Sequence, residues 1–258
     1  MKRFLHLTAL AIALSAIVGI FPSLSAPMPA KSAPIVSSQN VNFKPPNVTA
    51  PGNRQGATHR GPKCPADLSI TPLIPESNVG LTLSQSPTLF AYVSHAGTQV
   101  QFSLITEKET KDPDEVVYET AFKVDNAGII AVTIPAAAGN KQLMEVGKRY
   151  QWSLAVACSP GENTGENTGD RSNDLFVTGY VERIEAQPSL KNDLANPDPM
   201  AKLIVYAKNG IWYETTVATL AEMRRKTPDD AQLTAEWTQL LQSQKLDSIA
   251  NQPLVQSF

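Results

Sequence analysis

The stretch LMEVGKRYQWSLAVAC (Leu143–Cys158) decides how this chain is expected to fold. From Tyr150 through Trp152 to Cys158, every second side chain is apolar, and small or polar side chains stand between them. This period of two is typical of a β-strand with one face on a hydrophobic core and the other nearer water. The sequence therefore predicts a strand over Tyr150–Cys158, with Trp152 on its core face.

The residues just before this strand predict a tyrosine corner. Leu143, Val146, Gly147 and Tyr150 follow the spacing L-x-x-V-G-x-x-Y. That spacing resembles the corner before strand F of immunoglobulin-like and fibronectin-type sandwiches, in which the tyrosine hydroxyl bonds to the backbone a few residues upstream. We therefore expect the Tyr150 hydroxyl to bond to the backbone between Leu143 and Val146. Gly147 and Trp152 are the other structural residues of this corner.

Alternating runs of the same kind recur across residues 64–186, and turn signals such as Asp125–Gly128 separate them. Short alternating strands in one block favour a two-sheet sandwich over a parallel sheet. The expected fold class is therefore a β-rich α+β protein, a seven-stranded immunoglobulin- or fibronectin-III-like β-sandwich followed by a C-terminal α-helical hairpin region. The six further expected strands are Leu68–Leu73, Thr88–Val93, Val100–Glu107, Val116–Val124, Gly128–Ile134 and Leu175–Ile184.

The residues from 187 to 258 change to helical periodicity and form the expected helical tail. A first helix ends at Lys208–Gly210, a second covers Ile211–Lys226, and a third begins at a capping Thr227. A single helical hairpin cannot bury its own apolar face, so it must pack on another helix, on the sandwich or on a partner. We expect Trp237 to lie in a core and Trp212, beside a helix start, to be the exposed aromatic residue.

The chain opens with the pattern of a secretory signal peptide. Lys2 and Arg3 precede the mostly apolar run Leu5–Ile20, and small residues follow at Ser23–Ala26. The sequence predicts that residues 1–25 are cleaved, which places the mature protein in the periplasm or outside the cell. An uncleaved membrane anchor is the alternative, because the apolar run is almost long enough to span a bilayer. No later segment is apolar enough to cross a membrane, so no span is expected after cleavage.

Export determines how the two cysteines are interpreted. Cys64 and Cys158 are the only cysteines, and outside the cytosol such a pair is expected to form a disulfide. If successive strands run antiparallel, the start of the first strand and the end of the sixth lie at the same end of the sandwich. A catalytic thiol would need a nearby histidine, and only His59 and His95 follow the signal peptide. Zinc would need more ligands at closer spacing.

A proline-rich segment, residues 26–63, joins the signal peptide to the sandwich and is predicted to be a basic linker or arm. It has no acidic residue, whereas the region from Cys64 onward has 15 basic and 24 acidic residues and a charge of about −9. Two interpretations stay open: the arm folds back on the acidic body, or it contacts an anionic envelope surface or partner. Its five basic residues are Lys31, Lys44, Arg54, Arg60 and Lys63.

The sequence carries none of the common catalytic motifs. It has no glycine-rich phosphate loop, no G-x-S-x-G, no H-E-x-x-H and no cysteine-rich metal spacing. We therefore expect a protein that is not an enzyme and that needs neither cofactor nor metal. A pair of carboxylates acting as in glycosidases stays an alternative, because 24 acidic residues allow many pairings that a sequence does not place in space.

Several segments in order resemble one family. PGNRQGATHRGPKCP (Pro51–Pro65), LIPESNVGLTLSQSPTLFAYV (Leu73–Val93), VGKRYQWSLAVAC (Val146–Cys158), and KNGIWYETTVATLAEMRRKTPDD (Lys208–Asp230) with the following AEWTQLL together resemble the exported, mainly cyanobacterial family called domain of unknown function 928. This family has no agreed activity, so the resemblance implies a compartment and an architecture and no mechanism. Its basic, glycine-rich opening motif corresponds to Arg54, Gly56, Arg60, Gly61 and Cys64.

Taken together, these features predict an exported, non-enzymatic protein-binding or assembly module of the cell envelope. Its expected partner is an unknown envelope protein, and no nucleic acid is expected. Arg54, Arg60, Trp212 and Tyr213 are the candidate contact residues, and a groove lined by Trp212, Tyr213 and Trp237 would favour a protein partner. The alternatives are an envelope glycan- or polysaccharide-binding domain, which exposed aromatics on a flat sheet face would favour, and a carboxylate-based hydrolase.

Overall fold

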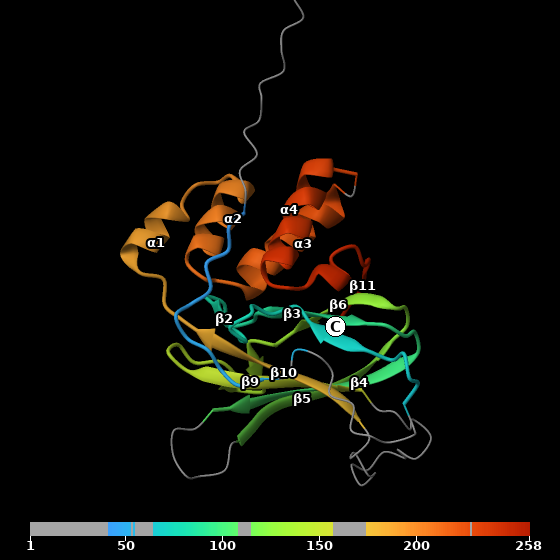
Figure 1. The fold of residues 1–258 in the computed structure, drawn as a ribbon. Helices are drawn as coiled ribbons and strands as arrows, with labels where there is room; N and C mark the ends of the chain where they lie inside the picture. Colours follow the sequence, from blue (N-terminus) through green and yellow to red (C-terminus); the bar gives the residue numbers. More distant parts are fainter. Residues whose placement is uncertain (1–40, 53, 55–63, 108–114, 157–173, 228) are drawn as a thin grey trace, which may run out of the picture. The chain divides into compact units, whose positions relative to one another are not determined.

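A computed structural model describes residues 41–52, 54, 64–107, 115–156, 174–227 and 229–258. Over these residues it is a β-rich α+β protein, as the sequence predicts, with helices concentrated toward the C-terminus (Figure 1). The predicted seven-stranded immunoglobulin-like sandwich is not confirmed, because the described residues form eleven strands in three sheets. Residues 1–25, Arg60 and Cys158 lie outside the described residues. The signal peptide, the contact role of Arg60 and the cysteine bridge therefore stay predictions.

The strand that the sequence singled out lies at the centre of a five-stranded sheet. Trp152, in this strand, is paired with Leu104 on one side and with Gly179 on the other. The core-facing residues of the strand are buried and those between them are half-buried, as period two predicts. From edge to edge the sheet consists of β2 (Val79–Thr82), β10 (Leu175–Arg183), β9 (Arg149–Val156), β4 (Thr98–Thr106) and β5 (Glu115–Val124), with β2 parallel to β10.

A four-stranded sheet lies against the buried face of the five-stranded sheet (Figure 1). Its β6 (Gly128–Thr133) is buried at every residue except the last, because one face meets the other sheet and the opposite face meets the helices. The order is β1 (Ile70–Pro72), β3 (Thr88–Val93), β6 and β11 (Leu254–Ser257), and β11 runs parallel to β6. A separate short hairpin is formed by β7 (Ala137–Ala138) and β8 (Lys141–Gln142).

The helices cover the outer face of the four-stranded sheet (Figure 1). The π-helix η2 packs on β2 and β3 and continues directly into α3. The predicted hairpin therefore packs its apolar face on the sheets, so its helices are part of the domain. The helical elements are α1 (Pro188–Asp193), α2 (Pro199–Lys208), η2 (Tyr213–Ala218), α3 (Thr219–Lys226), α4 (Ala231–Ser243) and the 3₁₀ helix η3 (Asp247–Ile249).

The predicted start of the third helix is wrong. Helix α4 begins at Ala231, and its N-cap is Asp230, whose carboxylate accepts the backbone N–H groups of Gln232 and Leu233. Asp230 displaces Thr227 from this role because the Thr227 hydroxyl instead donates to the carbonyl of Met223, in the last turn of α3. Among the described residues, no helix is both long and apolar enough to cross a membrane.

The described part of the predicted arm does not behave as a linker. Val41 and Phe43 are 1% and 4% exposed and belong to the common core. The Val41 N–H donates to the buried Glu236 carboxylate on α4 over 2.8 Å, and the Phe43 ring meets the edge of Trp212 with 4.8 Å between the centroids. The folded region therefore begins before Cys64. An alternation of apolar residues at Val41 and Phe43 is too short a signal to predict this packing.

The ends of the strands agree with the geometry on which the cysteine prediction depends. Ile70, at the start of β1, pairs with Val93, at the end of β3. Val156, at the end of β9, pairs with Val100, close to the start of β4 that follows β3. The start of β1 and the end of β9 thus lie at the same end of the two sheets. The bridge itself stays a prediction, because Cys158 lies outside the described residues.

Candidate functional site

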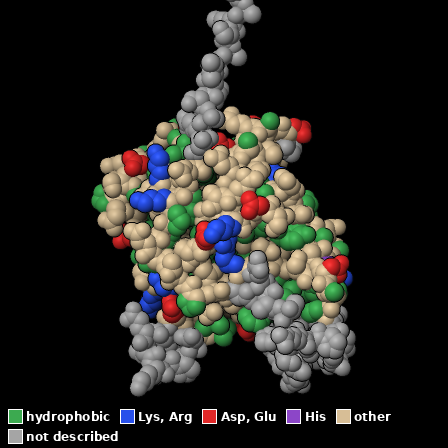
Figure 2. Space-filling view, in the orientation of Figure 1, with side chains coloured by type: hydrophobic (Ala, Val, Ile, Leu, Met, Phe, Trp, Pro, Cys, Tyr) green, Lys and Arg blue, Asp and Glu red, His purple; other side chains and the backbone are tan. Residues whose placement is uncertain are grey.

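The charged side chains do not gather by sign on the face that Figure 2 shows. Lysine and arginine side chains are scattered over this face, and acidic side chains lie beside several of them. Among the described residues, no group of three or more histidine, cysteine and acidic side chains is arranged to hold a metal ion. A functional surface in the described part of the chain therefore has to be sought in local combinations of charge, shape and apolar exposure.

The tyrosine corner fixes the loop from Leu143 to Lys148. The Tyr150 hydroxyl, with the residue only 1% exposed, accepts a hydrogen bond from the Glu145 N–H over 2.9 Å. Gly147 has a φ of 78°, a left-handed conformation that favours glycine, and its N–H donates to the carbonyl of Arg183. Two hydrogen bonds to different strands thus hold this loop against the end of the five-stranded sheet.

This loop forms one wall of a pocket of about 410 Å³, which we name the corner pocket. The opposite walls come from β4, β5, β8 and the start of β9. The side chains that line it include three acids and three bases. The lining residues are Thr106, Glu107, Glu115, Val117, Lys141, Gln142, Leu143, Glu145, Lys148, Arg149 and Tyr150.

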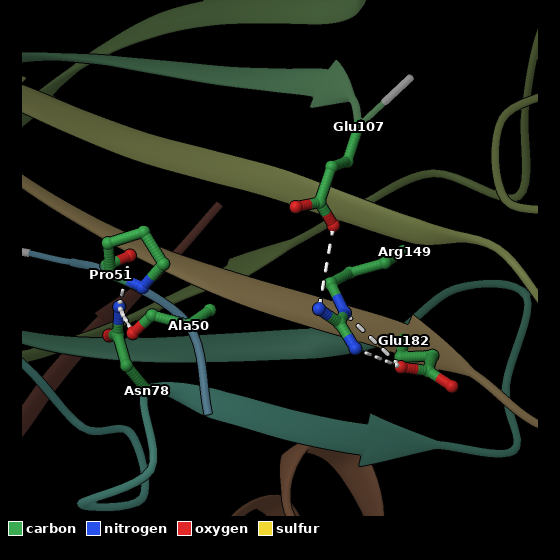
Figure 3. Close-up of polar contacts among 6 residues, drawn as sticks. All are labelled: Ala50, Pro51, Asn78, Glu107, Arg149 and Glu182. Carbon is green, nitrogen blue, oxygen red and sulfur yellow. Dashed lines mark hydrogen bonds and ion pairs between the residues drawn. The ribbon is translucent and has the colours of Figure 1, made fainter. Parts of the chain in front are cut away.

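Ion pairs hold the charged side chains of the corner pocket in place. Arg149 bridges two carboxylates, with 3.6 Å to Glu107 and 3.1 Å to Glu182 (Figure 3). Lys148 lies 3.0 Å from Glu145, and the hydrogen bond that its ammonium donates to the Glu145 carboxylate raises the pKa of Lys148. A lysine that serves as a general base needs its pKa lowered. The charges of the pocket are therefore suited to pairing and to recognition.

Two exposed apolar residues are neighbours in sequence of residues that line the corner pocket. Among the described residues, Val116 and Val146 are the large hydrophobic side chains that stand exposed, at 50% and 51%. Val116 lies between Glu115 and Val117, which both line the pocket, and Val146 directly follows the lining residue Glu145. Isolated exposed valines are ordinary on protein surfaces. Two of them, each next in sequence to residues that line one charged pocket, make this end of the sheet the strongest candidate site.

The prediction that Trp212 is exposed is wrong, and Tyr213 is also unavailable to a ligand. Trp212 is 0% and Tyr213 1% exposed. The Trp212 N–H donates to the Leu81 carbonyl on β2 and the indole N–H to the Leu73 carbonyl over 2.8 Å, so both groups tie the start of η2 to the sheets. Trp237, expected in the core, is 0% exposed. Within the described part of the chain, these three aromatics are buried and line no groove.

Arg54 is a structural residue in the described part of the opening motif. Its guanidinium donates to the carbonyls of Ile74 and Gln244, over 3.2 and 2.6 Å, and burial lowers its pKa. In the same segment, the carbonyl of Pro51 accepts a hydrogen bond from the Asn78 amide over 3.0 Å (Figure 3). The basic segment therefore fastens the loop before β2 to the end of α4, which agrees with the interpretation that it folds back on the body.

The corner pocket contains no residue that the sequence nominated for binding. The tyrosine corner could be predicted because its residues are local, whereas the acids and bases of the pocket come from separate strands. Arg149 and Glu182, for example, meet because β9 and β10 are paired in register. The one signal for these charged residues is the alternation of charge from Glu182 through Arg149 to Glu107 across neighbouring strands. This alternation can be recognised only after the strand pairing is known.

Comparison with known proteins identifies the family and adds no activity. Neither a curated protein nor a solved structure matches the chain. The model of the family described as Domain of Unknown Function (DUF928) matches residues 55–254, a range that includes the corner pocket, both large sheets up to the start of β11, and the helices. Because this match covers most of its length, the chain belongs to the DUF928 family.

Proposed function

We propose that this protein is a non-enzymatic protein-binding or assembly module that is exported to the cell envelope, and that the corner pocket with Val116 and Val146 is its docking surface. The observation that carries the proposal is that two exposed valines each directly adjoin, in the sequence, a residue that lines one charged pocket. Protein interfaces combine apolar side chains with polar and charged ones, and both kinds are exposed at this end of the sheet.

The fixed geometry of the pocket supports this proposal. Arg149 is held between Glu107 and Glu182, and the loop that carries Val146 is held by the Tyr150 hydroxyl. A surface that is already ordered loses little conformational freedom when a partner binds. A charged side chain of a partner can replace one member of a lysine–glutamate pair in the pocket. Such charge pairing contributes more to the specificity and orientation of binding than to its affinity.

The edge strand β5 extends the docking surface. β5 lies at the edge of the five-stranded sheet, and Glu115 and Val117 at its start line the corner pocket. An edge strand offers backbone groups to which an extended segment of a partner can pair. A partner that covers the two valines would therefore reach this edge without any rearrangement of the sheet.

The pairing of the glutamates favours this proposal over a carboxylate-based hydrolase. Such an enzyme needs two carboxyl groups that face a reacting bond, one of them with a raised pKa. Glu107 and Glu182 both contact Arg149, and Glu115 contacts Lys141 at 3.2 Å. Each of these carboxylates is therefore directed at a cation, whereas a glycosidase needs two carboxyl groups that face the same bond.

The test is a comparison of matched variants in one capture experiment. Tagged mature protein, residues 26–258, is incubated with envelope extract of the source organism, and bound proteins are identified by quantitative mass spectrometry. The Val116→Glu/Val146→Glu variant should lose partners that the wild type retains. The control is Gln239→Glu/Gln242→Glu, which adds the same charge on exposed positions of α4. If the valine variant folds as the wild type does and captures the same proteins, the docking surface is wrong.

A further inference from the structure

The outer face of the five-stranded sheet carries small side chains at its centre. Along β4 and β9 the buried residues face the other sheet, so the residues between them face outward. Ser103 pairs with Ser153 in the ladder, and Gln101 pairs with Ala155. The hydroxyls of Ser103 and Ser153 are hydrogen-bonded over 2.7 Å. This pair and Ala155 form a low floor that crosses two strands.

Larger side chains on the flanking strands turn this floor into a hollow. Glu119 on β5 stands opposite Ser103, and Phe176 on β10 stands opposite Ala155. Asp174 lies just before β10 and lines the same hollow, whose volume is about 270 Å³. Pockets that enclose a drug-sized ligand measure roughly 300–1,000 Å³, so this open hollow is suited to one ring of a longer molecule that lies across the sheet.

The chemistry of the lining restricts what such a ring can be. The Gln101 amide and the serine hydroxyls can donate and accept hydrogen bonds, the carboxylates of Glu119 and Asp174 accept them, and Phe176 supplies an apolar aromatic surface. Charged acceptors form the stronger hydrogen bonds to hydroxyl groups. None of the described lining residues is basic, so these residues offer an anionic ring no charge-assisted hydrogen bond.

We propose that this hollow binds one ring of a neutral oligosaccharide, with sugar hydroxyls on Glu119 and Asp174 and the apolar side of the ring against Phe176. This site goes beyond the proposed function and is separate from the corner pocket, with which it shares no lining residue. A sugar ring combines hydroxyl groups at its edge with an apolar face, and the lining supplies a partner for each. The module would then hold a polysaccharide on its sheet face and a protein at its corner.

The first experiment asks which saccharides bind. The mature protein is titrated with maltohexaose, cellohexaose and chitohexaose as neutral probes and with polygalacturonate as the anionic probe, by isothermal titration calorimetry and by NMR of labelled backbone amides. At least one neutral hexasaccharide should bind with a dissociation constant in the millimolar range or tighter. Its largest shifts should fall at Ser103, Ser153 and Phe176. The proposal is overturned if none of the neutral probes binds, or if polygalacturonate binds best.

The second experiment asks whether binding occurs in the hollow. Phe176→Ala should weaken binding about tenfold, which corresponds to the loss of one good contact, and Ser153→Trp should abolish it by filling the space. Gln99→Ala is the matched control, because Gln99 is exposed on the same strand as Gln101 and does not line the hollow. The proposal fails if both folded variants bind as the wild type does.

The two proposals fail separately. Val116→Glu/Val146→Glu should keep the saccharide affinity unchanged, and Phe176→Ala should keep the captured proteins unchanged. If Ser153→Trp does not fold, Glu119→Gln takes its place, since Glu119 is exposed and its side chain keeps nearly the same shape. It should weaken binding severalfold by removing a charged acceptor, and an unchanged affinity in both Glu119→Gln and Phe176→Ala overturns the assignment of the site.

Discussion

Replacing Tyr213 by phenylalanine tests whether the helical layer is held to the sheets by one buried hydroxyl. The Tyr213 hydroxyl donates to the Tyr180 carbonyl over 2.6 Å and accepts the Trp152 indole N–H over 2.9 Å. Tyr213 is 1% and Trp152 0% exposed, so water does not reach either group. The substitution keeps the ring and removes a hydroxyl that joins η2 to both β9 and β10.

The expected cost follows from the two bonds. Losing the bond to the Tyr180 carbonyl costs about 1 kcal/mol net, and leaving the buried Trp152 N–H without an acceptor costs about 1–3 kcal/mol more. Tyr213→Phe should therefore lower the free energy of unfolding by about 2–4 kcal/mol. That is a large share of the roughly 5–15 kcal/mol by which a typical domain is stable.

The assay is urea unfolding of the mature protein, followed by circular dichroism and by tryptophan fluorescence. Tyr118→Phe is the control, because it makes the same chemical change on a half-buried ring that packs near Phe102. It should change stability by less than about 0.5 kcal/mol, as surface substitutions usually do. If Tyr213→Phe is no more destabilising than this control, the hydroxyl does not hold the layers together and the reasoning is refuted.

Three further predictions concern the corner, the helical core and the cysteines. Tyr150→Phe should cost roughly 1 kcal/mol or somewhat more, because the Glu145 N–H loses its acceptor; an unchanged melting temperature would contradict this. Trp237→Ala should cost about 3 kcal/mol or more, measured by denaturant unfolding, because a fully buried ring leaves a cavity; iodide quenching of the single-tryptophan variant should fail to reach Trp237. Thiol alkylation under denaturing, non-reducing conditions should label neither Cys64 nor Cys158, and labelling of both would exclude the bridge.

The sequence predicts the strands that lie in the middle of long ladders. The expected Thr88–Val93 has the same bounds as β3, and the expected strands around Trp152 and Phe102 differ from β9 and β4 by two residues or fewer at each end. Apolar and polar residues alternate in these strands because one face is buried. The pattern can therefore be recognised in the sequence of each strand alone. The tyrosine corner is equally local, since the donor Glu145 and the acceptor Tyr150 are close neighbours in the sequence.

Elements whose stability comes from distant partners could not be predicted in this way. β2 has four residues, of which three are buried, and it exists because it runs parallel to β10. Gly80 in β2 lies against the Tyr213 ring, since a Cβ there would lie 2.5 Å from a ring carbon. The burial of Tyr213 is therefore set by a glycine far away in the sequence. The periodicity of the residues at the start of η2 does not indicate the contact between Gly80 and Tyr213.

The parallel strand β11 has a consequence for the order in which the protein can be assembled. β11 covers the edge of β6, and Phe258 just beyond it stacks on Phe122 of the other sheet, with 3.8 Å between the ring centroids. Synthesis proceeds from the N-terminus, so β6, with its apolar sequence GIIAVT, is synthesised long before its neighbour β11. Until β11 is made, β6 presents an open edge that other chains can pair with. The nascent protein is most prone to aggregation during this interval, which is when a chaperone that recognises such edges would act on it.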